Sequence, residues 1–256
     1  TYVDCFTSEC LQQDAGVREV PEMNGVTGAS VAIIEAGEDG AEHGEAVRSI
    51  ISTLAGSGTK TEFFKGSTHL DVAAAVRSAA EKGFKVINLS LEFSMASIVN
   101  WAAQTGQAFA NALLNFKSVL QGAVDYARSK GAVIVASAGN NDPELSVLAE
   151  LNGVVSVGAT DLLGRHQSFS NEGAALSLSA TGTQVYATAE SVGKARLYTG
   201  TSFATPIVTA VISKLMGYLF SKFGPNVNTS MVLTALQSSA DDLGVEGHDS
   251  TYGAGK

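Results

Sequence analysis

Short apolar runs alternate along the chain with longer segments in which apolar residues recur every three or four positions. Runs of the first kind are typical of strands buried on both faces of a parallel sheet, and segments of the second kind predict amphipathic helices. The expected strands cover 31–34, 61–65, 85–91, 132–136 and 153–158, and the expected helices cover 43–54, 71–82 and 229–240. This alternation predicts an α/β fold with three layers, in which a largely parallel central sheet carries helices on both faces.

Two segments are less regular. Residues 95–130 form one long helical stretch, for which a break near Thr105-Gly106 is an open alternative. Residues 176–187, together with 197–198, are expected to form antiparallel strands. Asp71 is the expected N-cap of the helix that follows it.

The first part of the chain, residues 1–27, shows no sustained period and is expected to form an irregular arm. The remainder, 28–256, is expected to be one domain, because a chain of this length can bury a single α/β core.

Residues 200–206, Gly-Thr-Ser-Phe-Ala-Thr-Pro, precede a run that is apolar on nearly every face. This pattern predicts a loop that turns into a core helix, with Ser202 and Pro206 in the first turn, where the missing N–H of proline has no cost. A hydroxyl at the start of a buried helix has two interpretations. It is either an ordinary helix cap or a nucleophile whose reaction the nearby helix N–H groups would assist.

Polar side chains also occur where other expected strands end and helices begin. Glu35 ends the first strand, His43 begins the next helix, and Asn140 follows the strand 132–136. Each has an ordinary structural explanation as a strand end, a cap or a turn. Together with Ser202 they supply an acid, a base, an oxyanion donor and a nucleophile, which is the set that acyl transfer requires.

These motifs resemble those of the subtilases, the subtilisin-like serine proteases. Residues 200–206 match the serine motif Gly-Thr-Ser-x-Ala-x-Pro of that family completely, and the order acid, histidine, serine is also that of subtilisins. The similarity extends over about residues 28–256 and includes the family patterns at 31–37, 43–44, 86–90, 133–140, 169–173 and 252–255.

The resemblance implies a serine endopeptidase with Glu35, His43 and Ser202 as the triad and Asn140 in the oxyanion hole. It also implies that two segments flank the substrate, and their residues are Ser90, Leu91, Glu92, Ser137, Ala138 and Gly139.

Four departures from the family pattern stand out. The acid is Glu35 instead of aspartate, and it lies only eight positions before His43, so that the long and often calcium-binding loop of the family is expected to be absent. Glu92-Phe93 replaces a Gly-Gly pair that normally faces the substrate backbone, and the chain stops at Lys256 where relatives continue. Glu38 and Asp39 are alternative acids, but Glu35 is favoured because a strand holds it.

The departures at Glu35 and Glu92-Phe93 keep a second hypothesis open, in which the chain is a pseudoprotease that retains the fold as a binding module. A third hypothesis, a protease that mainly processes its own precursor, is compatible with a chain that begins at Thr1. Protein or peptide substrates are the expected partners under the enzyme hypothesis, together with the chain's own propeptide.

Composition narrows the partners further. A net charge of −9 without a cluster of Lys and Arg disfavours nucleic acid, and no apolar run reaches the roughly 20 residues of a membrane span. No metal or cofactor is expected. Cys5 and Cys10 are either two thiols or a short local disulfide. Because the chain begins at Thr1, an upstream leader is an expectation, and a secreted or periplasmic location is favoured.

Overall fold

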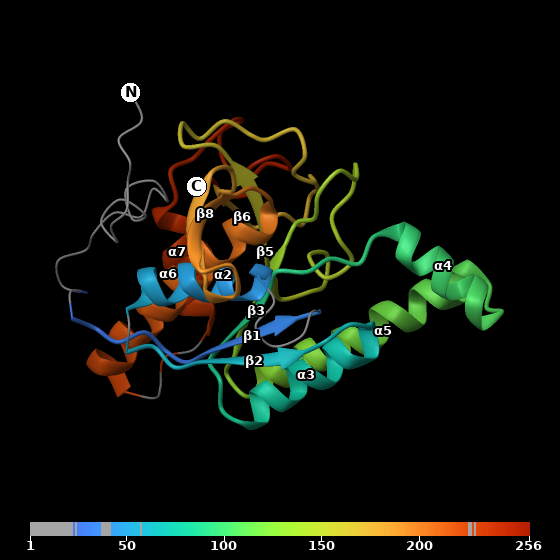
Figure 1. Cartoon of the computed structure of the whole chain (residues 1–256), viewed down its shortest axis with the longest axis horizontal. Coiled ribbons are helices and arrows are strands. Elements are labelled where there is room, and N and C mark those ends of the chain that lie inside the picture. Colours follow the sequence, from blue (N-terminus) through green and yellow to red (C-terminus); the bar gives the residue numbers. More distant parts are fainter. Residues whose placement is uncertain (1–22, 24, 37–41, 57, 225–226, 228) are drawn as a thin grey trace.

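The computed structural model describes residues 23, 25–36, 42–56, 58–224, 227 and 229–256 (Figure 1). Cys5, Cys10, Glu38, Asp39 and most of the expected N-terminal arm lie outside the described residues. The fold class predicted from the sequence is confirmed: a parallel sheet lies between two layers of helices.

The central sheet has six parallel strands in the order β2-β1-β3-β4-β5-β6. In chain order these strands are β1 (Val31–Glu35), β2 (Thr61–Lys65), β3 (Val86–Leu89), β4 (Val133–Ser137), β5 (Val154–Thr160) and β6 (Leu178–Thr181). A separate antiparallel hairpin consists of β7 (Val185–Ala189) and β8 (Lys194–Tyr198), joined by the short 3₁₀ helix η2 (Glu190–Val192).

Successive residues of each strand point to opposite faces of the sheet, which gives the protein two apolar cores. On one face, strand residues such as Ile33 pack with α2 (Glu42–Ala55), α6 (Thr201–Phe223) and α7 (Thr229–Ser239). On the other face, residues such as Ile34 pack with α3 (His69–Glu81), α4 (Met95–Thr105) and α5 (Phe109–Ser129). Figure 1 shows α3 and α5 beneath the sheet, with α4 extending beyond it.

The structure corrects two details of the sequence analysis and decides a third. The α3 helix begins at His69, and its N-cap is Thr68, which forms a capping box with Asp71, so Asp71 is not the cap. The strand β6 pairs in parallel with β5 instead of joining an antiparallel group. The long helical stretch is divided into α4 and α5 at Gly106, as the alternative proposed.

The helix α6 runs through one core. By length and composition alone, α6 is the one helix of the described residues that could cross a membrane. The sequence analysis expects no such segment. Because 61% of its most apolar window is buried inside the fold, this apolar character is that of a core helix. Its first residue, Thr201, is at the same edge of the sheet as the carboxyl ends of β1, β3 and β4, where α/β folds place ligand sites.

Candidate active site

The contact between Glu35 and His43 joins the end of β1 to the start of α2. Oε2 of Glu35 lies 2.6 Å from Nδ1 of His43, and the other carboxylate oxygen, Oε1, accepts the backbone N–H of Ala36 at 2.9 Å. The side chain of Glu35 is 13% exposed, and that of His43 is 36% exposed. Because a carboxylate oxygen accepts hydrogen bonds, Nδ1 of His43 is the donor in this contact, and in a neutral ring Nε2 is then the acceptor.

Gly44 provides the space for this longer acid. A Cβ atom at Gly44 would lie 3.2 Å from Cγ of Glu35 and 3.2 Å from Cε1 of Phe63. A glycine in the first turn of α2 therefore lets the extra methylene group of glutamate fit between helix and strand.

Ser202 is the second residue of α6, and its hydroxyl donates to the backbone carbonyl of Ser90 at 3.3 Å. The Ser90 hydroxyl in turn donates to the backbone carbonyl of Ser202 at 2.8 Å. Pro206 explains why this carbonyl is free, since an ordinary residue four positions on would donate its N–H to it. Pro206 is the sixth residue of the helix, so its expected place in the first turn is wrong, and Ser90 replaces the missing donor.

A buried chain of hydrogen bonds extends this contact into the sheet. Nδ2 of Asn88 donates to the Ser90 hydroxyl at 2.9 Å, and Oδ1 of Asn88 accepts the hydroxyl of Thr209 at 2.8 Å. Asn88 and Thr209 are fully buried, and their side-chain polar groups are therefore stabilised by these hydrogen bonds instead of by water. These bonds fix the start of α6 relative to β3, and the polar Asn88 within an apolar strand was the available signal in the sequence.

Asn140 lies in the loop that follows β4 and contacts the start of α6. Its Oδ1 accepts both the backbone N–H of Thr201 at 3.0 Å and the Thr201 hydroxyl at 3.2 Å. The Nδ2 group is therefore the donating end of the amide, and it also interacts with the Glu92 carboxylate. Gly139, with a φ of 104°, makes the turn before Asn140, and a Cβ atom there would lie 2.4 Å from Nδ2 of Asn171.

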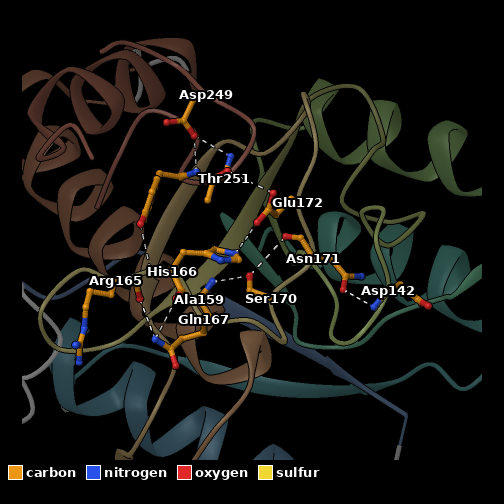
Figure 2. Close-up of polar contacts among 11 residues, drawn as sticks. Asp142, Ala159, Arg165, His166, Gln167, Ser170, Asn171, Glu172, Asp249 and Thr251 are labelled. Carbon is orange, nitrogen blue, oxygen red and sulfur yellow. Dashed lines mark hydrogen bonds and ion pairs between the residues drawn. The ribbon is translucent and has the colours of Figure 1, made fainter. Parts of the chain in front are cut away.

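The segment 166–172 supports the Asn140 loop. The backbone N–H of Asn171 donates to the Gly139 carbonyl at 3.1 Å, and Oδ1 of Asn171 accepts the N–H of Asp142 at 2.8 Å. Ser170 is tied to the sheet because its hydroxyl accepts the N–H of Ala159 at 2.9 Å (Figure 2). The sequence analysis noted this segment only as a family pattern, and the structure gives it a physical role as a brace.

A cavity of about 370 Å³ opens between these elements. Its lining residues are His43, Asn140, Asn141, Phe169, Thr199, Gly200, Ser202 and Phe203. Three of the four residues in the predicted catalytic set therefore line one cavity, and the fourth, Glu35, contacts one of them. Phe203 packs edge-on against the His43 ring with centroids 5.3 Å apart, a contact that the sequence analysis missed.

The residues expected to flank a substrate differ in their accessibility. Ser137 and Ala138 are buried, and the N–H and carbonyl of Ala138 bond to Val157 and Ser146 within the fold. By contrast, the N–H groups of Leu91 and Glu92 donate to no acceptor among the described residues. The Leu91 carbonyl accepts the Ser137 hydroxyl at 3.1 Å, so this residue faces β4 and the open backbone edge is at Glu92. The role of these residues in substrate binding remains a prediction.

Glu92 adjoins Asn140, since Oε2 of Glu92 accepts the backbone N–H of Asn140 at 2.8 Å. Although the residue as a whole is exposed, desolvation of its carboxyl group raises the pKa of Glu92 above its ordinary value. Nearby Asp142 raises this pKa further, whereas hydrogen bonds from the backbone N–H and the side-chain amide of Asn140 oppose the shift. Within the described residues, no group of three or more His, Cys, Asp or Glu is arranged to hold a metal ion.

Comparison with known proteins agrees with this architecture. The profile described as "Subtilase family" matches residues 26–255. The chain is 31% identical over 250 residues to M-protease from Shouchella clausii (strain KSM-K16), a match that covers 94% of this chain and 60% of the relative. It is also 31% identical over 250 residues to Subtilisin Savinase from Lederbergia lenta, a match that covers 94% of this chain and 85% of that relative.

Among solved structures, the self-cleaved protease domain of PatA is similar, with a TM-score of 0.67 and 26% identity. That match covers 84% of this chain and 91% of the PatA chain. The fold and the site define an α/β protein with the parts of a serine hydrolase. The chain belongs to the subtilase family, the subtilisin-like serine proteases.

Proposed function

We propose that this protein is a serine endopeptidase that hydrolyses peptide bonds through an acyl-enzyme, with Ser202, His43 and Glu35 as its triad. The observation that carries the proposal is the 2.6 Å contact between Glu35 and His43 beside a cavity that Ser202 also lines. The carboxylate orients the ring and stabilises the imidazolium that forms when Nε2 accepts a proton.

The first step forms the acyl-enzyme. Rotation about the Cα–Cβ bond of Ser202 moves its hydroxyl from the Ser90 carbonyl to Nε2 of His43. His43 then takes the proton as Oγ attacks the substrate carbonyl carbon, and negative charge develops on the carbonyl oxygen. Nδ2 of Asn140 and the backbone N–H of Ser202 stabilise this charge, and such donors act best when they are held in place beforehand.

The remaining steps return the enzyme to its starting state. The C–N bond breaks, and the departing amine takes the proton from His43. Water then attacks the acyl carbon and gives its proton to His43, after which Ser202 recovers that proton and leaves as the free hydroxyl. The products are an amine and a carboxylic acid, and no further reactant is needed.

Proteins and peptides are the proposed substrates. The open N–H group of Glu92 supports this proposal, because an extended peptide can pair with an exposed backbone edge. The chain's own precursor is a further proposed substrate. Its similarity to a PatA domain that is described as self-cleaved supports that idea.

A non-catalytic binding module is the rival hypothesis, motivated by Glu35 and Glu92. The 2.6 Å contact of the longer acid with His43 argues against decay of the site, and Gly44, a residue of the family's histidine pattern, leaves room for that acid. The joint presence of Ser202, His43 and Asn140 at one cavity supports catalysis in the same way.

Covalent labelling tests the proposal. A fluorophosphonate probe should modify the wild-type protein at Ser202, and peptide mapping should locate the adduct there. Ser202→Ala should remove the label, and Ser213→Ala, which changes another serine of the same helix, should retain it. A folded wild-type protein that takes up no probe would instead support the binding-module hypothesis.

A further inference from the structure

Glu92 is a negatively charged group without a cationic partner at the edge of the proposed active site. Among the described residues, no Lys, Arg or His lies within ion-pair distance of its carboxylate. It accepts a hydrogen bond from the backbone N–H of Asn140 at 2.8 Å, and the Asn140 side-chain amide also interacts with it. A desolvated carboxylate is stabilised most strongly by a cation, and the protein does not provide one here.

The position of Glu92 relative to a bound peptide follows from the chemistry of the cavity. The scissile carbonyl carbon must lie next to Oγ of Ser202, with its oxygen toward the side-chain amide of Asn140. Glu92 contacts the backbone of that same Asn140. The substrate residue that carries the scissile carbonyl is therefore the one whose side chain lies nearest to Glu92.

The backbone of the segment 90–92 gives the same result. The Ser90 carbonyl lies 3.3 Å from the Ser202 hydroxyl, so the segment starts beside the nucleophile. Two residues of extended chain span about 7 Å, which places Glu92 within the reach of a long side chain on the adjacent substrate residue. The free N–H group of Glu92 allows a peptide to pair with the edge of this segment.

We propose that Glu92 is a specificity-determining residue that selects Lys or Arg at the substrate position carrying the scissile carbonyl. The inference rests on the proposed function and names its substrate class. A basic side chain would pair with the Glu92 carboxylate, whereas an acidic side chain would meet it as a like charge. Asp142, which raises the pKa of Glu92, adds negative potential to the same place.

Paired substrates test this inference. Three fluorogenic peptides that differ only in having Lys, Met or Glu at this position should be cleaved in that order of kcat/KM. The kcat/KM of the Lys peptide should exceed that of the Met peptide by about tenfold or more, as expected for a partly desolvated charge pair. Glu92→Gln keeps an acceptor for the Asn140 N–H and removes the charge, so it should abolish most of this preference.

The matched control is Glu144→Gln, which removes the same charge from an exposed position of the Asn140 loop. This variant should retain the preference for Lys. An unchanged Lys-to-Met ratio in Glu92→Gln would overturn the inference. It would also be overturned if Glu92→Gln raised kcat/KM equally for all three peptides, because the carboxylate would then act as a block on the oxyanion donors.

A binding measurement separates this inference from the proposed function. Fluorescence anisotropy with labelled, intact peptides and Ser202→Ala protein reports recognition without turnover. The Lys peptide should bind more tightly than the Met peptide, and Glu92→Gln should remove the difference. If the preference is present in binding but the wild type cleaves no peptide, the proposed function fails and the inference stands. If the wild type cleaves peptides without any preference, the inference fails alone.

Discussion

Gly44 lies so close to Glu35 that a Cβ atom at Gly44 would be 3.2 Å from Cγ and 3.5 Å from Oε2 of the acid. Both residues are held by regular structure, Glu35 by β1 and Gly44 by the first turn of α2. The two residues therefore pack closely, and the glutamate side chain fits because position 44 is a glycine.

Gly44→Ala should lower kcat by about 10- to 100-fold, because it displaces the carboxylate from the His43 ring. The free energy of unfolding should not fall through helix propensity, since alanine favours a helix more than glycine does. Steady-state kinetics and urea unfolding measure the two effects. In a Glu35→Asp background, Gly44→Ala should lower kcat by a smaller factor, because the shorter acid leaves room for the Cβ atom. An equal fall in kcat in both backgrounds would contradict the packing argument.

Ser90→Ala should destabilise the protein by about 1–3 kcal/mol, because the Ser202 carbonyl and the Asn88 amide both lose their partner. Adding Pro206→Ala restores a backbone N–H that can donate to the Ser202 carbonyl. The double variant should therefore be more stable than the sum of the two single changes predicts. Urea unfolding of the four proteins measures this coupling, and strict additivity would rule out the exchange of donors.

His43→Ala should remove nearly all turnover, whereas Asn140→Ala should reduce kcat by about 10²- to 10³-fold, because the backbone N–H of Ser202 remains as a second oxyanion donor. Both variants should be compared at saturating peptide with folding checked by circular dichroism. Unchanged turnover in Asn140→Ala would mean that its amide serves only to hold Thr201.

The sheet could be predicted from the sequence because each buried strand is a local apolar run, and the regions of five strands were found in this way. Other features depend on residues far apart in the chain. Ser90 donates to a carbonyl 112 positions away, so the donor that replaces the missing N–H of Pro206 could not be inferred locally. The contact of Glu92 with Asn140 spans 48 positions. The short strand β6 was misassigned because its partner β5 is set by the fold and not by neighbouring residues.

The buried side chain of His69 should make the free energy of unfolding depend on pH. It is buried between Phe116, with ring centroids 4.0 Å apart, and Trp101, at 4.8 Å. Burial lowers the pKa of His69 below its ordinary value of 6.5, although Asp71 opposes this shift. The unfolded chain therefore binds more protons below about pH 6.5, so the contribution of His69 is complete above that pH and is lost as the pH falls.

Urea unfolding between about pH 8 and about pH 5 measures this effect by linkage. The free energy of unfolding should decline less steeply in His69→Phe than in the wild type, because phenylalanine keeps the stacking and removes the titrating group. Identical slopes for the two proteins would show that His69 does not contribute.

Hydrolysis of an unstructured protein by wild type, Glu35→Asp and Glu35→Gln tests the central claim most directly, namely that Glu35 is the native acid of a working triad. The wild type should be active, and Glu35→Asp should be slower by about 10²-fold, because the shorter carboxylate falls about 1 Å or more short of His43. Glu35→Gln should hydrolyse the protein slowly, since a neutral amide does not stabilise the imidazolium. A clear rise in activity in Glu35→Asp over the wild type would contradict the account.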